Sequence, residues 1–467
     1  MAAQVKLVRR RDFGSDISSL SLFNYEDGFS LTRDGWIQAV ARDGDMRTSE
    51  AMTLRVEASS HDDLASTLQA LDDKLREVAW YNDAAERYGV WLRAQLPDET
   101  EARQALITQA GGEIGSPVLA PPLSPGNALR QYHLALERIP FWEATSHITF
   151  NVDYVNCTGG QAYYVTTDPP GEIYGDVPAR LASLSFKGRS GGGTLYEFWL
   201  GFRTDRFGVR GNFAPVWECE DGSLDNDTTS VADATAHGGY KAECTFDGSA
   251  AMLERATVAI EDVTTNYADQ RGSFIVLLRA KVDSGTTCRV RLFDGFESTA
   301  ALGVDAQWRS QQRVIVDSTS WLLHPLGTID IPPSGDCILS DSLRHFALMV
   351  KAERTAGSDS LHLDSLILIP QGEGAVYAGG GGVQYSVPGD PRPIKIRHYA
   401  DGPIAAWAYY QNMPIVTANV EPHKYGLPVG IGDLVLAGQG ASSHTLTDAV
   451  DIELQIYPRY RTLRGAE

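Results

Sequence analysis

The sequence predicts a mainly β fold with one long α-helix near the N-terminus. Short alternating segments separated by Gly, Pro, Asp and Ser recur along most of the 467 residues, which is typical of strands joined by turns. Apolar residues at helical spacing are evident only after Ser60, which indicates a single helix. The apolar share of 43% suffices for buried cores and the charged share is only 21%, so the composition does not favour wholesale disorder.

Residues 1–145 are expected to form an N-terminal α+β domain. Ser60 lies three residues before Asp63 and fits an acidic capping box. The leucines that follow are spaced by three or four residues, which predicts a helix over 61–82. Glycine- and proline-rich loops are expected at 111–115 and 120–126. The predicted strands of this domain are Ser18–Asn24, Trp36–Ala41, Met52–Glu57, Val90–Leu96 and Leu129–Arg138.

The middle region, residues 146–380, is predicted to be a large β-sandwich of the jelly-roll type. Its strands are short and regularly spaced, and its size fits one large sandwich better than two small ones. The glycine run Gly379–Gly382 marks its end. The remaining β segment, 381–467, is either a small β domain or the completion of the sheet begun by residues 1–145. We favour completion, because insertion of a domain is tolerated where the chain ends lie close together.

The composition excludes several classes of function. Forty Lys and Arg against sixty Asp and Glu give a formal charge of −20, which argues against coating nucleic acid and against docking on an anionic membrane. No apolar run of about 18 residues occurs, so membrane insertion is not expected. No signal-peptide-like apolar run follows the basic start, which favours synthesis in a cytoplasm. The five cysteines are expected to be buried free thiols, with a Cys219–Cys244 bridge as the alternative.

No catalytic motif is present, and we expect no enzyme activity and no cofactor. The sequence lacks a GxSxG elbow, an HExxH pair and a GxxxxGK[ST] loop. The triplet Gly191–Gly193 precedes an expected strand, whereas a phosphate cradle needs a helix N-terminus. The ten histidines contain no i,i+4 pair.

Two groups of residues are candidate binding sites. The acidic segment 218–227 contains Asp221, Asp225 and Asp227, whose oxygens could hold a structural calcium ion; a solvated acidic loop is the alternative. Trp217 and Trp308 could stack on the sugar rings of a glycan; a place in the sandwich core is the alternative.

The early strands, the leucine-striped helix, the strand VWLRAQL at 90–96, and the segment LALERIPFWE at 134–143 are similar to a known family. They resemble tail proteins of long-tailed bacteriophages, especially the distal-tail or baseplate-hub type, and the resemblance extends loosely to IYPRYR at 456–461. It implies a structural virion protein of the tail that is made in the host cytoplasm. The large middle sandwich and the further β segment depart from a minimal distal-tail protein.

The resemblance further implies a homo-oligomeric ring formed through residues 1–145, in contact with other tail proteins. The jelly roll would then decorate the particle or bind a host surface glycan. Two alternatives stay open: a carbohydrate-binding or glycan-active protein that uses the jelly roll, and a capsid decoration protein.

Overall fold

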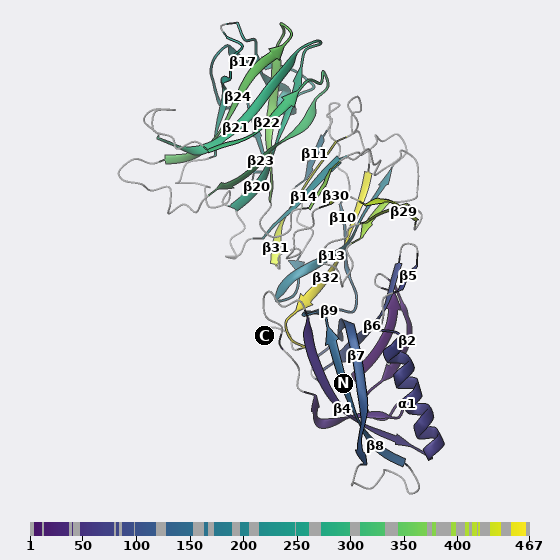
Figure 1. Ribbon diagram of the computed structural model, residues 1–467. Coiled ribbons are helices and arrows are strands. Elements are labelled where there is room, and N and C mark those ends of the chain that lie inside the picture. The colour runs from purple at the N-terminus through teal and green to yellow at the C-terminus, as the bar shows by residue number, and fades with distance from the viewer. Residues whose placement is uncertain are drawn as a thin grey trace.

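The protein is described from a computed structural model (Figure 1). The described residues are 4–11, 14–36, 40, 47–78, 81–83, 86–97, 99–117, 128–152, 163–166, 172–188, 197–204, 214–247, 249–260, 272–298, 309–331, 344–370, 376–379, 394–397, 407–410, 413–417, 419–420, 430–439 and 450–463. Strands dominate, the sheets are antiparallel, and the fold is mainly β as the sequence predicts.

The N-terminal strands form one end of the molecule in Figure 1. They are β1 (Gln4–Arg11), β2 (Asp16–Ser21), β3 (Phe29–Trp36), β4 (Thr48–Ala58), β5 (Tyr81–Asp83), β6 (Glu86–Gln95), β7 (Arg103–Pro117), β8 (Ala128–Arg138) and β9 (Trp142–Ala144). The strand order is β2-β1-β6-β7-β9, and β8, β4 and β3 continue from the far part of β7. The long β7 therefore belongs to two groups of paired strands.

The helix α1 (His61–Arg76) packs against these strands. The Ser60 side chain accepts a hydrogen bond from the Asp63 backbone N–H at 3.1 Å, which confirms the predicted cap. The expected helix end at 82 is wrong, because residues 81–83 pair with β6 and the chain must leave the helix before them. The buried stripe Leu64, Leu71 and Leu75 nevertheless enters the N-terminal core. Among the described residues no helix is long and apolar enough to cross a membrane.

The expected loop at 111–115 is also wrong, because these residues lie in β7. Gly111 and Gly112 pair with Ala135 and Leu134 of β8, so the glycines interrupt neither the strand nor its register. The expected loop at 120–126 lies outside the described residues.

Strands that precede the sandwich in the sequence pair with strands that follow it. They are β10 (Ile148–Val152), β11 (Tyr163–Thr166), β12 (Glu172–Ile173), β13 (Val177–Gly188), β14 (Glu197–Thr204), β26 (Val376–Gly379), β27 (Ile394–Arg397), β28 (Trp407–Tyr410), β29 (Met413–Thr417), β30 (Asn419–Val420), β31 (Gly430–Gln439) and β32 (Val450–Tyr460). β13 pairs with β27 and β32, and β14 pairs with β26 and β31. β32 also pairs with β9, and Leu463 beyond it enters the N-terminal core. The C-terminal strand thus extends the N-terminal sheet.

The sandwich lies at the opposite end of the molecule in Figure 1. Its elements are β15 (Val216–Glu218), β16 (Ser223–Leu224), β17 (Thr228–Ala232), the 3₁₀ turn η1 (His237–Gly239), β18 (Tyr240–Cys244), β19 (Leu253–Ile260), β20 (Gly272–Val282), β21 (Thr287–Ser298), β22 (Arg309–Val316), β23 (Leu322–Ile331), β24 (Arg344–Ala356) and β25 (Leu361–Pro370). We call β17-β18-β25-β20-β23, with β15, the front sheet, and β16-β19-β24-β21-β22 the back sheet. One apolar core fills the space between them.

The two-sheet unit is therefore narrower than the predicted 146–380. Its described strands run from 216 to 370, whereas the strands from 148 to 204 pair outside it. Alternation in the sequence identifies a strand but not its partner, which explains why the predicted boundary is wrong.

The outer face of the front sheet is divided into two parts. At one part, Trp199 of β14 and Val435 and Ala437 of β31 pack against apolar residues of the front sheet, which are Leu277, Leu323, Ile367 and Ile369. At the other part, β18, β20 and β25 present charged side chains. Polar side chains gather on this second part and also at the β9–β32 pairing.

Candidate functional site

The first polar site is a buried junction centred on Glu143 of β9. The carboxylate of Glu143 accepts two hydrogen bonds from Arg180 of β13, each 2.8 Å long, and one from Arg459 of β32 at 3.0 Å. The side chains of Glu143 and Arg180 are fully buried. Although burial raises it, the two guanidinium groups hold the pKa of Glu143 below its usual value. One carboxylate therefore joins three strands that are far apart in sequence.

Aromatic rings cover the cations around this junction. The guanidinium group of Arg180 lies 4.7 Å from the centroid of Tyr457, and that of Arg103 lies 3.6 Å from the centroid of Tyr460. Such cation–π contacts stabilise a cation that has lost its hydration. Arg103 also donates to the backbone carbonyl of Thr462 at 2.8 Å, which fixes the end of the chain on β7.

A second buried ion pair lies beside the junction. Arg138, at the end of β8, donates to Glu50 of β4 at 2.9 and 2.7 Å, and both side chains are fully buried. Its guanidinium group lies 4.3 Å from the centroid of Trp142. The segment 134–143, which prompted the family resemblance, thus supplies Arg138, which pairs within the N-terminal strands, and Glu143, which joins them to β13 and β32.

The basic start of the chain is used within the protein. Arg9 pairs with Glu77 at 3.1 Å. Arg10 is buried, with 5% of its surface exposed, and donates to Gln104 at 2.8 Å. Arg11 lies over the ring of Tyr88. All three arginines therefore make contacts within the chain.

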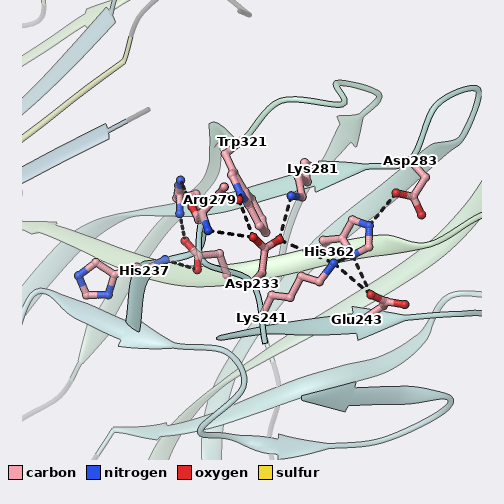
Figure 2. Close-up of polar contacts among 11 residues, drawn as sticks. Asp233, His237, Lys241, Glu243, Arg279, Lys281, Asp283, Trp321 and His362 are labelled. Atoms are coloured by element: carbon pink, nitrogen blue, oxygen red, sulfur yellow. Dashed lines mark hydrogen bonds and ion pairs between the residues drawn. The ribbon is translucent and has the colours of Figure 1, made fainter. Parts of the chain in front are cut away.

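The second polar site is the charged part of the front sheet, drawn in Figure 2. Along β25, Leu361 and Leu363 belong to the sandwich core, while His362 faces outward (Figure 2). Asp364, two residues after His362, lies on the same side of the strand. His362 lies 3.0 Å from Asp283 through Nε2 and 3.0 Å from Lys241 Nζ through Nδ1. An ammonium group can only donate, so Nδ1 accepts and Nε2 carries the proton that is donated to Asp283.

Asp233 connects the lysines of this face. Its Oδ2 atom lies 3.0 Å from Lys281 Nζ and 3.8 Å from Lys241 Nζ. Burial raises the pKa of Asp233, but hydrogen bonds from Thr235 and Lys281 hold it below its usual value. Lys241 also pairs with Glu243 at 3.1 Å. The charges on this face are therefore matched with one another and held in fixed positions.

Arg279 and Asp364 form the buried part of the same face. They make an ion pair with both side chains almost fully buried, and the guanidinium group lies 4.8 Å from the centroid of Trp321. Burial raises the pKa of Asp364 to about 6 despite the adjacent Arg279. His237 donates its backbone N–H to Asp364 at 2.9 Å, and its ring contacts Glu218.

The candidate sites expected from sequence differ from these two. Trp217 lies on β15, half-buried against the sandwich core, and donates from Nε1 to the Ala214 carbonyl at 2.9 Å. This position favours the core alternative for its role. Trp308 lies outside the described residues, so its predicted part in glycan binding stays a prediction.

The aspartates of the predicted calcium site lie in a turn beside β16 and β17. Asp225 accepts from the backbone N–H of Asn226 at 2.7 Å, and Asn226 and Asp227 have φ values of 48° and 59°. The part of the chain that the structure describes contains no group of three His, Cys, Asp or Glu side chains placed to hold a metal ion. Asp221, Asp225 and Asp227 are therefore not brought together as a ligand set, and the calcium site has no support from the geometry.

The cysteines that the structure describes, Cys219, Cys244 and Cys288, are buried and free. The predicted free thiols are confirmed at these positions, and the alternative Cys219–Cys244 bridge is absent there. Burial raises the pKa of Cys244 to about 11 and that of Cys288 to about 12, which makes both thiols unreactive.

Sequence reasoning missed the polar face of the front sheet. The signal was the alternation Leu361-His362-Leu363-Asp364, in which polar residues interrupt a leucine-rich strand. Such alternation indicates a strand with one apolar and one polar face. It does not reveal that Lys241, 121 positions before His362, is its neighbour.

No protein-family model matches this chain, and no curated protein matches it. Among solved structures, a similarity is found to the SPP1 Dit (gp 19.1) protein, described as a paradigm of the hub adsorption apparatus in phages that infect Gram-positive bacteria. The sequence identity is 11%, the match covers 74% of this chain and 98% of that chain, and the TM-score is 0.20.

Proposed function

We propose that this chain is a non-enzymatic structural protein of a bacteriophage tail, at the distal tail, the baseplate or a tail-associated ring. It oligomerises through residues 1–145 and presents the sandwich for decoration or for contact with the host. The proposal starts from the sequence resemblance at 134–143 and 456–461. The observation that carries it is that these two distant segments form one buried junction, with Arg459 and Tyr460 paired to Glu143 and Trp142.

A junction of this kind suits a protein that must keep its shape under load. Fully buried Arg–carboxylate pairs fix the relative position of β9, β13 and β32 more narrowly than apolar contacts do, because two-point hydrogen bonding has directional requirements. The sheet edges of the N-terminal part then offer rigid surfaces for copies of the same chain.

Electron microscopy of the purified full-length protein tests the oligomeric part of the proposal. Rings in negative stain, together with a mass by light scattering that is a fixed multiple of the 50.8 kDa chain, are expected. A strictly monomeric protein at high concentration would contradict ring formation. Cryo-electron microscopy of particles then locates the chain: density at the tail supports the proposal, and density on the head supports a capsid decoration protein instead.

We also infer that the sandwich is a jelly roll. From β18 to β25 the chain passes to the other sheet at every step except between β21 and β22. The resulting orders, β18-β25-β20-β23 and β19-β24-β21-β22, are those of two interleaved Greek keys.

The second candidate function is binding of a host glycan by the sandwich. The charged part of the front sheet favours it, since Lys281, Asp233 and Glu243 are partly exposed and held in fixed positions by their ion pairs. Fixed polar groups bind sugar hydroxyls at a low entropic cost. Binding on a glycan array that is lost in Lys281→Ala and retained in Arg289→Ala, an exposed arginine of the back sheet, would support it. An array without any bound glycan would contradict it.

A further inference from the structure

The segment Asp233–Gly239, here called the strap, lies across the outer face of the front sheet (Figure 2). Trp321 donates from Nε1 to the Thr235 hydroxyl at 2.9 Å. Arg279 donates to the Thr235 carbonyl at 3.1 Å, and the strap residue Ala236 is 97% buried, with 3% of its surface exposed. The strap therefore covers Trp321, Arg279 and Asp364, the buried part of the polar face.

Three carboxyl groups meet under the end of the strap. Glu218 contacts the His237 ring, and Asp364 pairs with Arg279 and accepts from the His237 backbone. Glu220 is the third: a Cβ atom placed on Gly238 would lie 3.6 Å from Glu218 Cδ and 3.7 Å from Glu220 Oε1. The cluster therefore contains more carboxyl groups than cations.

The Glu220 carboxyl group has no cation to neutralise it in the described structure. Its Oε2 atom and that of Glu218 are buried and lack a hydrogen-bond partner among the described residues. The groups that face Glu220 are Glu218, Cys219 and Asp221 on its own segment, and Asp364 on β25. His237 on the strap is held by Glu218, and Arg279 on β20 is held by Asp364. An ionised Glu220 would add a negative charge to this cluster, and no cation of the described residues faces it.

We propose that a proton held on Glu220 keeps the strap closed over the front sheet, and that loss of this proton opens it. Opening removes the strap from Trp321, Arg279 and Asp364 and changes the polar face that the sandwich presents. The sandwich would thus have a closed and an open state selected by pH. This inference does not depend on the proposed tail function.

Loss of a proton from Glu220 and loss of a proton from His237 both favour the open state of the strap. Burial, with Glu218 and Asp364 nearby, raises the pKa of Glu220 to about 8, and the hydrogen bond to Glu218 raises the pKa of His237. A group whose pKa is raised by folding stabilises the closed state below its usual pKa, and this stabilisation is lost as the pH rises through the raised value. As the pH rises through about 8, Glu220 becomes charged. Loss of the His237 charge, which folding moves to a higher pH than usual, favours opening as well.

Hydrogen exchange followed by mass spectrometry on the full-length protein tests the proposal. The readout is the protection of peptides that cover 233–240, corrected for the intrinsic exchange rate at each pH. If Glu220 titrates at its ordinary value of 4.5 in the open state and at about 8 in the closed state, protection should fall about tenfold between pH 7 and pH 9. In Glu220→Gln, which keeps the shape and removes the charge, the fall should be several-fold smaller.

Glu353→Gln is the matched control, because Glu353 lies on the back sheet and pairs with Arg289 at 3.4 Å; it should behave as the wild type. An equal fall in Glu220→Gln and in the wild type would overturn the proposal. If Glu220→Gln does not fold, the wild-type profile decides: protection that falls as the pH rises and levels off just above pH 8 supports the proposal, and a flat profile refutes it.

Discussion

Replacing Glu143 with glutamine is expected to destabilise the protein by about 3–5 kcal/mol, because removal of one partner leaves a buried cation without a counter-charge. The Glu143 and Arg180 side chains are both 0% exposed, and Arg459 is 17% exposed. Glutamine fills nearly the same volume, so little of the loss comes from packing. Most of it is the cost of keeping Arg180 desolvated without the negative charge of Glu143.

The measurement is denaturant unfolding of the full-length protein, followed by circular dichroism at pH 7. The control is Asp72→Asn on the surface of α1. Asp72 pairs with Arg76 at 2.7 Å, but the two side chains are 48% and 72% exposed. An exposed pair of this kind contributes at most about 0.5 kcal/mol. If Glu143→Gln costs less than about 1 kcal/mol, as the control should, the junction does not stabilise the protein in the way described.

A double substitution tests whether the loss in Glu143→Gln comes from the buried charge that remains on Arg180. Glu143→Leu combined with Arg180→Met removes both buried charges and should cost clearly less than the sum of the two single changes. The pH dependence gives an independent check. Because the pKa of Glu143 is lowered by folding, its contribution is present above the ordinary value and is lost as the pH falls through the lowered one. Glu143→Gln should lack this loss on acidification.

Other parts of the molecule give three further predictions. Leu71→Ala should cost about 2–5 kcal/mol, since this helix residue is fully buried, whereas Gln69→Ala on the exposed side of α1 should change the unfolding free energy by less than about 0.5 kcal/mol. Burial lowers the pKa of His324 from 6.5 to about 4, so acidification from pH 6.5 to 4 should cost about 3 kcal/mol; unfolding of His324→Leu should lack this component, and an unchanged pH profile would refute it. A thiol reagent added to the native protein should modify at most two of the five cysteines, and reaction of more than two would contradict the burial of three thiols, which are Cys219, Cys244 and Cys288.

Local patterns predicted the elements well where the determining interactions are local. The cap at Ser60 forms as expected, and the strand over 129–138 is found as β8. Where the partner is distant, local patterns failed. Gly111 and Gly112 belong to a strand because β8 holds them in register, and the helix ends early because residues 81–83 pair with β6.

The candidate sites likewise depend on partners that are distant in the sequence. The resemblance at 134–143 identified residues that matter for the architecture, but nothing in the sequence paired Glu143 with Arg180 and Arg459. The aspartates expected to bind calcium attracted attention through their density in one segment. The front sheet instead joins charges from four separate segments, including Lys241, Lys281 and His362, and so no local density of charge marked it.

The sequence by itself determined the mainly β class, the capped helix that begins after Ser60, and the burial of the three described thiols. Each of these depends on local hydrogen bonding, on the spacing of apolar residues or on the hydrophobicity of a short segment, and such information lies within a few residues. Only the tertiary structure decided that β32 joins β9, that the described strands of the sandwich run from 216 to 370, and that Glu220 lies under the strap. Strand pairing and burial of charge depend on residues that are far apart in the sequence. These interactions stabilise the protein only once folding has brought the residues together.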